Sequence, residues 1–158
     1  MKKIVKKKRI YFSFAFLLLL IYGYDFMEMR ISTPTYQKIL AENPLGLQAE
    51  FGTLSTEGRD LRYLEIGRDS LPLVVFIHGA PSSSSFWRTF LKDTSLLAKA
   101  KLMAVDRPGY GYSGYGKPEI SVKKQAALIA EVIREKRGQH PSVILHGSSY
   151  GGTVAWKS

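Results

Sequence analysis

The residues VILHGSSYGG, at positions 143–152, decide the fold. An apolar run typical of a buried strand leads into Gly147, Ser149 and Gly151, a G-x-S-x-G pattern with a glycine two positions before and two positions after a serine. Such glycines let a strand and the following helix pass closely, and the sharp turn between them exposes the serine hydroxyl above the sheet. Ser148 lacks this spacing, so Ser149 is the candidate nucleophile.

Two further loops follow apolar runs in the same way. LVVFI (73–77) leads into HGAP (78–81), and KLMAVD (101–106) leads into a glycine-rich loop. Strands that are apolar on both faces are typical of a parallel sheet, in which ligands bind at the carboxyl ends of the strands. We expect the backbone N–H groups of Ala80 and Tyr150 to form an oxyanion hole there, because the helix that starts after the serine adds partial positive charge.

The order of the predicted elements indicates an α/β domain. Residues 47–67 predict two strands around a turn, and residues 85–97 predict a helix. Ser121–Arg137 predicts the clearest helix, with apolar residues on one face and Ser121 as its N-cap. Because strands and helices alternate after the first two strands, we expect a mostly parallel, doubly wound sheet with helices on both faces.

Together, the three loops resemble those of the α/β-hydrolase superfamily. VVFIHGAPSSSSFW is similar to its oxyanion loop, AVDRPGYGYSG to the loop after its next core strand, and VILHGSSYGG to its nucleophile elbow. The resemblance covers about residues 47–158. It implies a serine hydrolase that cleaves an ester, amide or similar acyl bond through an acyl-enzyme on Ser149, with no metal or organic cofactor. Members that act on epoxides or haloalkanes carry Asp at the elbow, so Ser149 disfavours those two activities.

The catalytic acid and the histidine that the resemblance implies are missing from the sequence. In this family they follow the nucleophile, but YGGTVAWKS after Ser149 contains no Asp, Glu or His. We therefore expect residues 47–158 to be the N-terminal part of a longer hydrolase domain, with the strand at 143–145 in the middle of the complete sheet, and we expect this part alone to be inactive. A triad of His78, Asp106 and Ser149 is the alternative, although a structural role for His78 is favoured.

The N-terminus differs in composition from the rest of the chain. Six of the 23 Lys and Arg residues precede residue 10, whereas residues 31–158 hold 16 against 11 Asp and Glu. Residues 1–9 therefore predict a basic cytoplasmic head, residues 10–27 a transmembrane signal anchor, and residues 28–46 a stalk, which places the catalytic domain on the extracytoplasmic side. A cleaved signal peptide is disfavoured, because no small-residue cleavage site follows the apolar run.

Composition also limits the classes of partner and function. The chain has no cysteine, which excludes disulfides and thiolate metal sites, and its basic residues do not interleave with aromatic ones as nucleic-acid binding requires. The expected partners are a small-molecule acyl substrate and the membrane. Two rival hypotheses are a non-catalytic, membrane-anchored half-hydrolase scaffold used for binding or assembly, and acyl transfer to an acceptor other than water. Five loop aromatics are expected mainly to pack within their loops, with pocket walls as the alternative: Phe86, Trp87, Tyr110, Tyr112 and Tyr115.

Overall fold

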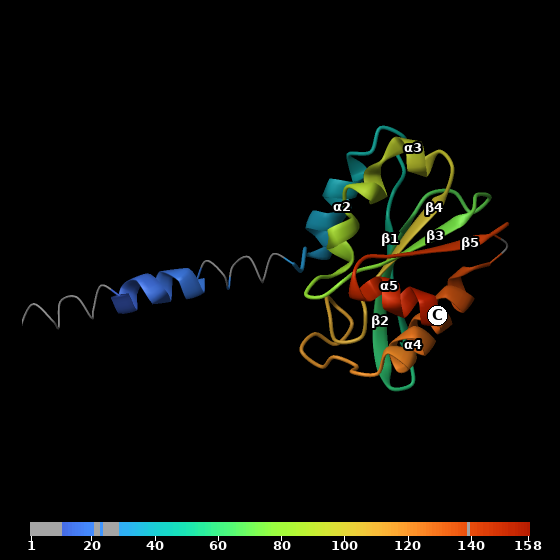
Figure 1. The fold of residues 1–158 in the computed structure, drawn as a ribbon. Helices are drawn as coiled ribbons and strands as arrows, with labels where there is room; N and C mark the ends of the chain where they lie inside the picture. Colours follow the sequence, from blue (N-terminus) through green and yellow to red (C-terminus); the bar gives the residue numbers. More distant parts are fainter. Residues whose placement is uncertain (1–10, 21–22, 24–28, 139) are drawn as a thin grey trace, which may run out of the picture.

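The computed structural model describes residues 11–20, 23, 29–138 and 140–158. Its centre is a five-stranded sheet with the strand order β1-β2-β4-β3-β5 (Figure 1). The strands are β1 (Glu50–Thr56), β2 (Arg59–Ile66), β3 (Leu73–Ile77), β4 (Lys101–Val105) and β5 (Val143–Gly147). β3 lies between β4 and β5 and is parallel to both, whereas β2 is antiparallel to both of its neighbours.

The sheet is therefore mixed, which corrects the expectation of a mostly parallel one. β1 and β2 form a hairpin whose turn residues, Glu57 and Gly58, have positive φ angles of 48° and 70°. A two-residue turn of this kind matches the twist of the strands that it joins. The hairpin adds to the parallel strands through β2, with Tyr63 opposite Val105 of β4. In the described part of the chain, β5 pairs with β3 alone and lies at the edge of the sheet, where Ile144 is exposed.

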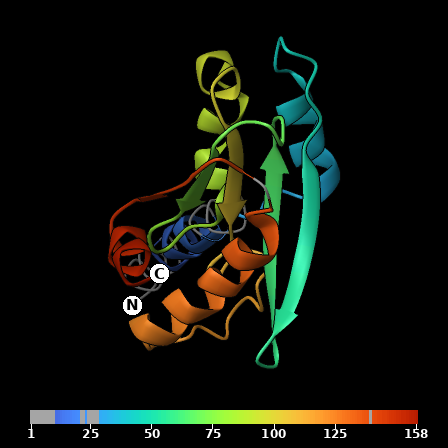
Figure 2. The same ribbon diagram turned by 90° about the vertical axis from the view of Figure 1, so that its right-hand side faces the viewer.

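Helices cover both faces of the sheet, as the doubly wound arrangement predicts. The helical elements are α2 (Thr33–Ala41), η1 (Ser84–Trp87), η2 (Phe90–Lys92), α3 (Thr94–Leu97), α4 (Val122–Lys136) and α5 (Tyr150–Lys157). On one face, Leu40 of α2 and Trp87 of η1 lie in the same buried cluster as Phe76. On the other face, Ile129 of α4 and Val154 of α5 are buried with the opposite side of β3 and β4, and Figure 2 shows these two helices side by side.

The clearest predicted helix forms almost as the sequence indicates. α4 spans Val122–Lys136, and the Ser121 hydroxyl accepts a hydrogen bond from the backbone N–H of Lys124 at 3.3 Å. Gly138, just beyond the helix, has a φ of 44°, the left-handed conformation that glycine adopts readily after a helix end. Good caps at both ends explain why the predicted limits lie within one residue of the observed ones.

Two segments that precede β4 differ from the prediction. Where residues 28–46 were expected to form a stalk, α2 packs into the core with Tyr36 and Leu40 fully covered. The helix expected over residues 85–97 is split into η1, η2 and α3. Asp93 causes the last break, because its carboxylate accepts hydrogen bonds from the N–H groups of Ser95 and Leu96 and so starts a new helix.

The predicted transmembrane anchor finds no support in the structure. Residues 11–20 are helical, but the rest of the predicted segment 10–27, apart from residue 23, lies outside the described residues, as does the basic head 1–9. Among the residues that are described, no helix has both the length and the apolar character needed to cross a bilayer.

Candidate active site

Ser149 lies at the sharp turn between β5 and α5, as the G-x-S-x-G pattern predicts. Its backbone angles are φ 50° and ψ −125°, in a region that residues with a side chain rarely occupy. Its side chain is exposed, and among the described residues the hydroxyl has no hydrogen-bond partner. A strained, exposed serine at the end of a strand is the geometry that a nucleophile at this position requires.

The two glycines that flank Ser149 are required by close backbone contacts. A Cβ added at Gly147 would lie 2.4 Å from the carbonyl oxygen of Gly151. A Cβ added at Gly151 would lie 2.3 Å from the carbonyl oxygen of Ile77, at the end of the neighbouring strand. At Gly152, one position later, the nearest atom would be 3.4 Å away. The turn can therefore form only with glycine at positions 147 and 151.

A cavity of about 420 Å³ opens in front of Ser149. The loop after β3 forms one side of it, and Gly79 lies so close to the elbow that an added Cβ would be 3.2 Å from the Cβ of Ser149. Ala80 also lines this cavity. In the described part of the chain, the N–H groups of Ala80 and Tyr150 donate to no acceptor. The assignment of these two amides to an oxyanion hole stays a prediction, and their position next to Ser149 fits it.

His78 is buried, and both of its ring nitrogens are engaged by backbone groups of the loops after β3 and β4. Its Nδ1 donates to the carbonyl oxygen of Gly79 at 2.7 Å, and its Nε2 accepts from the N–H of Arg107 at 3.0 Å. The pKa of His78 is lowered to about 3, mainly because burial disfavours the charged ring; the Gly79 hydrogen bond acts against this effect and the nearby Arg107 guanidinium adds to it. A neutral imidazole with both nitrogens engaged cannot take a proton from Ser149, so the structural role is favoured.

Asp106, the acid of the alternative triad, is committed to backbone N–H groups of its own loop and of the loop after β3. Its carboxylate accepts hydrogen bonds from the N–H of Ser84 at 2.6 Å and from the N–H of Tyr112 at 2.9 Å. Burial raises the pKa of this carboxyl group, and these two hydrogen bonds act against the rise. Neither His78 nor Ser149 contacts the carboxylate through a hydrogen bond, so the geometry does not form the alternative triad.

Arg107 connects the loops that surround the site. Its guanidinium donates to Gln125 of α4 at 2.9 Å and to the carbonyl oxygen of Gly79 at 3.1 Å. It also lies over the rings of Tyr110 and Tyr150, at 4.4 Å and 4.7 Å from their centroids. One buried cation thus links the loops after β3 and β4 to both helices behind the elbow, and the planar, multiply donating guanidinium suits this role.

The remaining histidines are also bound elsewhere. His140 contacts the carbonyl oxygen of Leu71 at 2.7 Å through Nδ1. The His146 ring packs edge-on against Phe76 and Trp87. No histidine of the described chain forms a hydrogen bond with Ser149, and the same residues include no cluster of His, Asp and Glu that could hold a metal ion.

The loop aromatics divide between packing and cavity walls. Trp87 is buried in the core, whereas Phe86 is half exposed and lines the Ser149 cavity. Tyr110 and Tyr115 line a smaller cavity nearby. Sequence reasoning missed Met29, which lines both cavities, because a single methionine in an unpatterned segment gives no signal.

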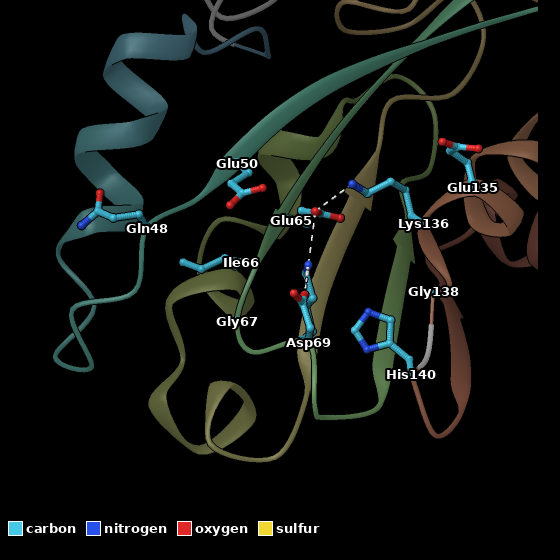
Figure 3. Close-up of a pocket in the computed structure, with 11 residues that line it drawn as sticks. Gln48, Glu50, Glu65, Ile66, Gly67, Asp69, Glu135, Lys136, Gly138 and His140 are labelled. Carbon is cyan, nitrogen blue, oxygen red and sulfur yellow. Dashed lines mark hydrogen bonds and ion pairs between the residues drawn. The ribbon is translucent and has the colours of Figure 1, made fainter.

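A separate cavity of about 600 Å³ lies at the other end of the sheet, where β3 and β4 begin (Figure 3). One carboxylate oxygen of Glu65 accepts from Lys101 at 3.2 Å and from Lys136 at 2.9 Å, and Lys101 also pairs with Asp69 at 2.5 Å. Burial acts to lower the pKa of Lys101, but its pairing with Asp69 and Glu65 outweighs burial and raises the pKa. None of the predicted site residues lies here, and the ion pairs serve to join β2, β4 and α4.

Comparisons with known proteins agree with the fold. A model of the alpha/beta hydrolase family matches residues 74–157, more than half of the chain. Epoxide hydrolase 1 from Caenorhabditis elegans is 33% identical over 99 residues, which are 61% of this chain and 24% of that protein. The chain therefore spans about a quarter of the length of this curated relative.

Solved structures with similar folds include a haloalkane dehalogenase and a thioesterase domain. A loop variant of a haloalkane dehalogenase from Bradyrhizobium elkanii matches with a TM-score of 0.57 and 31% identity, over 68% of this chain and 35% of that one. A thioesterase domain from the curacin biosynthetic pathway matches with a TM-score of 0.54 and 25% identity, over 67% of this chain and 37% of that one. The regions matched in these structures are little more than a third of each.

Proposed function

Because the chain belongs to the alpha/beta hydrolase family, we propose that it supplies the nucleophile of an acyl hydrolase, with Ser149 attacking an ester, amide or similar bond. The observation that carries the proposal is the conformation of Ser149, an exposed serine with a φ of 50° at a turn that only its flanking glycines allow. A hydroxyl held in this way faces a cavity that also contains the loop of Ala80.

The proposed reaction runs through an acyl-enzyme. The Ser149 oxygen bonds to the substrate carbonyl carbon while a base takes its proton, and the negative charge that forms on the carbonyl oxygen is met by the amides of Ala80 and Tyr150. Collapse of this intermediate expels the alcohol or amine, and water then releases the acid. Because His78 is buried and engaged on both nitrogens, we expect the base and its carboxylate partner to come from outside these 158 residues.

The relatives named as an epoxide hydrolase and a haloalkane dehalogenase suggest a different substrate class, and the nucleophile argues against it. A carboxylate that opens an epoxide or displaces a halide forms an ester, which water can cleave. A serine oxygen in the same step would form an ether, which water does not cleave, so turnover would stop. Serine at position 149 therefore favours acyl substrates. Attachment to a membrane through residues 10–27 stays a prediction of the sequence.

The proposal is tested by hydrolysis of 4-nitrophenyl butyrate, with the protein purified from the cell that makes it. We expect Ser149→Ala to lower kcat/KM by about 10³-fold or more, as loss of a serine nucleophile does, and Ser148→Ala to keep most of the activity. Residues 1–158 produced alone should not exceed the background rate. Equal rates for the wild type and Ser149→Ala, or turnover of styrene oxide or 1-bromobutane in place of the ester, would contradict the proposal.

If the protein hydrolyses none of these substrates, the scaffold hypothesis takes its place. That hypothesis needs the fold but not the hydroxyl of Ser149, so the Ser149→Ala variant would then be indistinguishable from the wild type in every assay of binding or assembly.

A further inference from the structure

Residues 29–32, which we call the N-terminal strap, are fixed beside the Ser149 cavity, which Met29 lines. The carbonyl oxygen of Met29 accepts hydrogen bonds from the hydroxyls of Ser83 and Ser85, the latter at 3.0 Å. The guanidinium of Arg30 lies 4.5 Å from the ring centroid of Tyr112 and 4.8 Å from that of Tyr115. The strap is therefore held by the loops after β3 and β4 at the same time.

The strap is also anchored at its other end. The hydroxyl of Ser32 caps α2 by accepting from the N–H of Thr35. Within α2, Tyr36 is buried and its hydroxyl donates to the carbonyl oxygen of Ser84 at 3.0 Å. Arg62 of β2 donates to the side chain of Thr33 at 2.9 Å. α2 belongs to the core and directly follows the strap. The position of the strap is therefore fixed, and the strap can form part of a binding site.

Behind the strap lies a second cavity, of about 210 Å³. Much of its lining is carbon, from the side chains of Met29, Pro81, Tyr110, Tyr115 and Pro118. Met29 and Pro81 line the Ser149 cavity as well, and so does Ser82, so the two cavities share one wall. The single charged side chain among the residues that line the smaller cavity is Arg30, whose guanidinium is already stacked on two tyrosine rings.

We infer that the strap is a wall of the substrate cleft and that the cavity behind it binds an unbranched alkyl chain of the substrate. The inference rests on the proposed function, since it takes the acyl carbonyl to lie at Ser149. From there the chain would run past Pro81 and beneath Met29 into the smaller cavity. A largely apolar cavity next to the nucleophile favours a hydrocarbon chain, because burying each methylene is favourable. The substrate class is therefore a medium- or long-chain acyl ester, and Met29 determines the accepted length.

The inference predicts a dependence of binding on chain length that does not require catalysis. We would titrate the protein with butanoate, hexanoate, octanoate and decanoate below their micelle concentrations, using calorimetry. Affinity should rise by up to about fourfold per methylene, the ratio that corresponds to about 0.8 kcal/mol. The Ser149→Ala variant should show the same rise, because the alkyl chain and not the hydroxyl carries the binding energy.

Met29→Trp, which fills the smaller cavity, should weaken decanoate binding at least tenfold and weaken butanoate binding much less. Ile120→Trp is the matched control, because Ile120 is 89% exposed and lines neither cavity. An affinity that does not depend on chain length, or equal effects of the two tryptophan variants, would overturn the inference. If decanoate binds as expected but no ester is hydrolysed, the proposed function fails and the chain-binding cavity remains.

A second measurement avoids substitutions in case Met29→Trp does not fold. A decanoate analogue with a terminal diazirine is photolysed on the unmodified protein, and the labelled peptides are identified by mass spectrometry. Labels on the peptides that contain Met29 or Tyr115 would support the inference. Labels confined to other parts of the protein would overturn it.

Discussion

Ser149 has backbone angles that a residue with a side chain rarely adopts, and the surrounding residues keep it there. The Gly147 and Gly151 backbones lie so close to each other and to Ile77 that the turn has no room for a Cβ at either position. A conformation of this kind costs about 1–3 kcal/mol, and it persists because the packing of β5 and α5 around it offers no alternative. The sequence pattern predicted this site because the spacing of the glycines follows directly from those contacts.

Two neighbouring glycines allow a sharp test at this scale. Gly151→Ala should lower the free energy of unfolding by about 1–3 kcal/mol or more, because the new methyl group would overlap the carbonyl oxygen of Ile77. Gly152→Ala should change it by less than about 1 kcal/mol, because its Cβ has space and alanine favours a helix. Urea unfolding of both variants measures the difference. Equal stability of the two variants would show that the close approach at residue 151 does not exist.

At the scale of elements, the loops at the carboxyl ends of β3, β4 and β5 act as one unit. His78 receives the N–H of Arg107, Arg107 reaches back to Gly79, and Asp106 holds the N–H groups of Ser84 and Tyr112. These buried polar groups bond to one another, and they hold the loops that flank the Ser149 cavity together. Sequence reasoning identified the loops but not these bonds, because a buried histidine and a catalytic one look alike in a sequence.

The burial of His78 predicts how stability depends on pH. In the folded protein its pKa is lowered to about 3, whereas an unfolded chain has a histidine pKa near 6.5. The stabilisation is therefore complete above about pH 6.5 and is lost as the pH falls toward 3, because only the unfolded chain takes up the proton. His78 alone should contribute a slope of up to about 1.4 kcal/mol per pH unit to the free energy of unfolding below pH 6.

Urea unfolding between pH 8 and pH 5 measures this slope, with His78→Gln as the control. The comparison matters because burial raises the pKa of Asp106, whose protonation would act in the opposite direction in both proteins. If His78→Gln does not fold, NMR of the His78 imidazole carbons gives the same information, since the shifts of this ring should stay constant between pH 8 and 5. The same pH slope with and without His78, or a titration of its ring near pH 6.5, would contradict the buried, neutral imidazole.

The predicted elements show which signals a sequence carries. β3 and β4 were predicted almost to the residue, because uninterrupted apolar runs specify buried strands. α2 was expected to belong to a stalk, since its apolar residues are few and only the packing of Tyr36 and Leu40 against the sheet reveals its place. The last break in the helix that was expected over residues 85–97 depends on one side chain, the Asp93 carboxylate, and the apolar pattern of the segment does not reveal it.

At the scale of the whole molecule, an antiparallel hairpin and three parallel strands form one sheet. The parallel strands β3, β4 and β5 carry the site, and the hairpin of β1 and β2 extends the sheet away from it. The sequence predicted both parts but not their relative direction, because hydrophobic patterning sets which face of a strand is buried and not which neighbour it pairs with. The position of Met29 in the cavity wall could not be predicted from the sequence either, since it depends on contacts with Ser83 and Ser85, which lie more than fifty residues away in the chain.

The central claim is that this alpha/beta hydrolase chain carries its nucleophile at Ser149. The most direct measurement treats the protein from its own cell with an alkyl fluorophosphonate, which bonds to an activated serine oxygen through phosphorus and releases fluoride, and then locates the adduct by peptide mass spectrometry. We expect a single adduct on Ser149 that is lost in Ser149→Ala. An adduct on another serine, or a folded protein that gains no adduct at all, would contradict it.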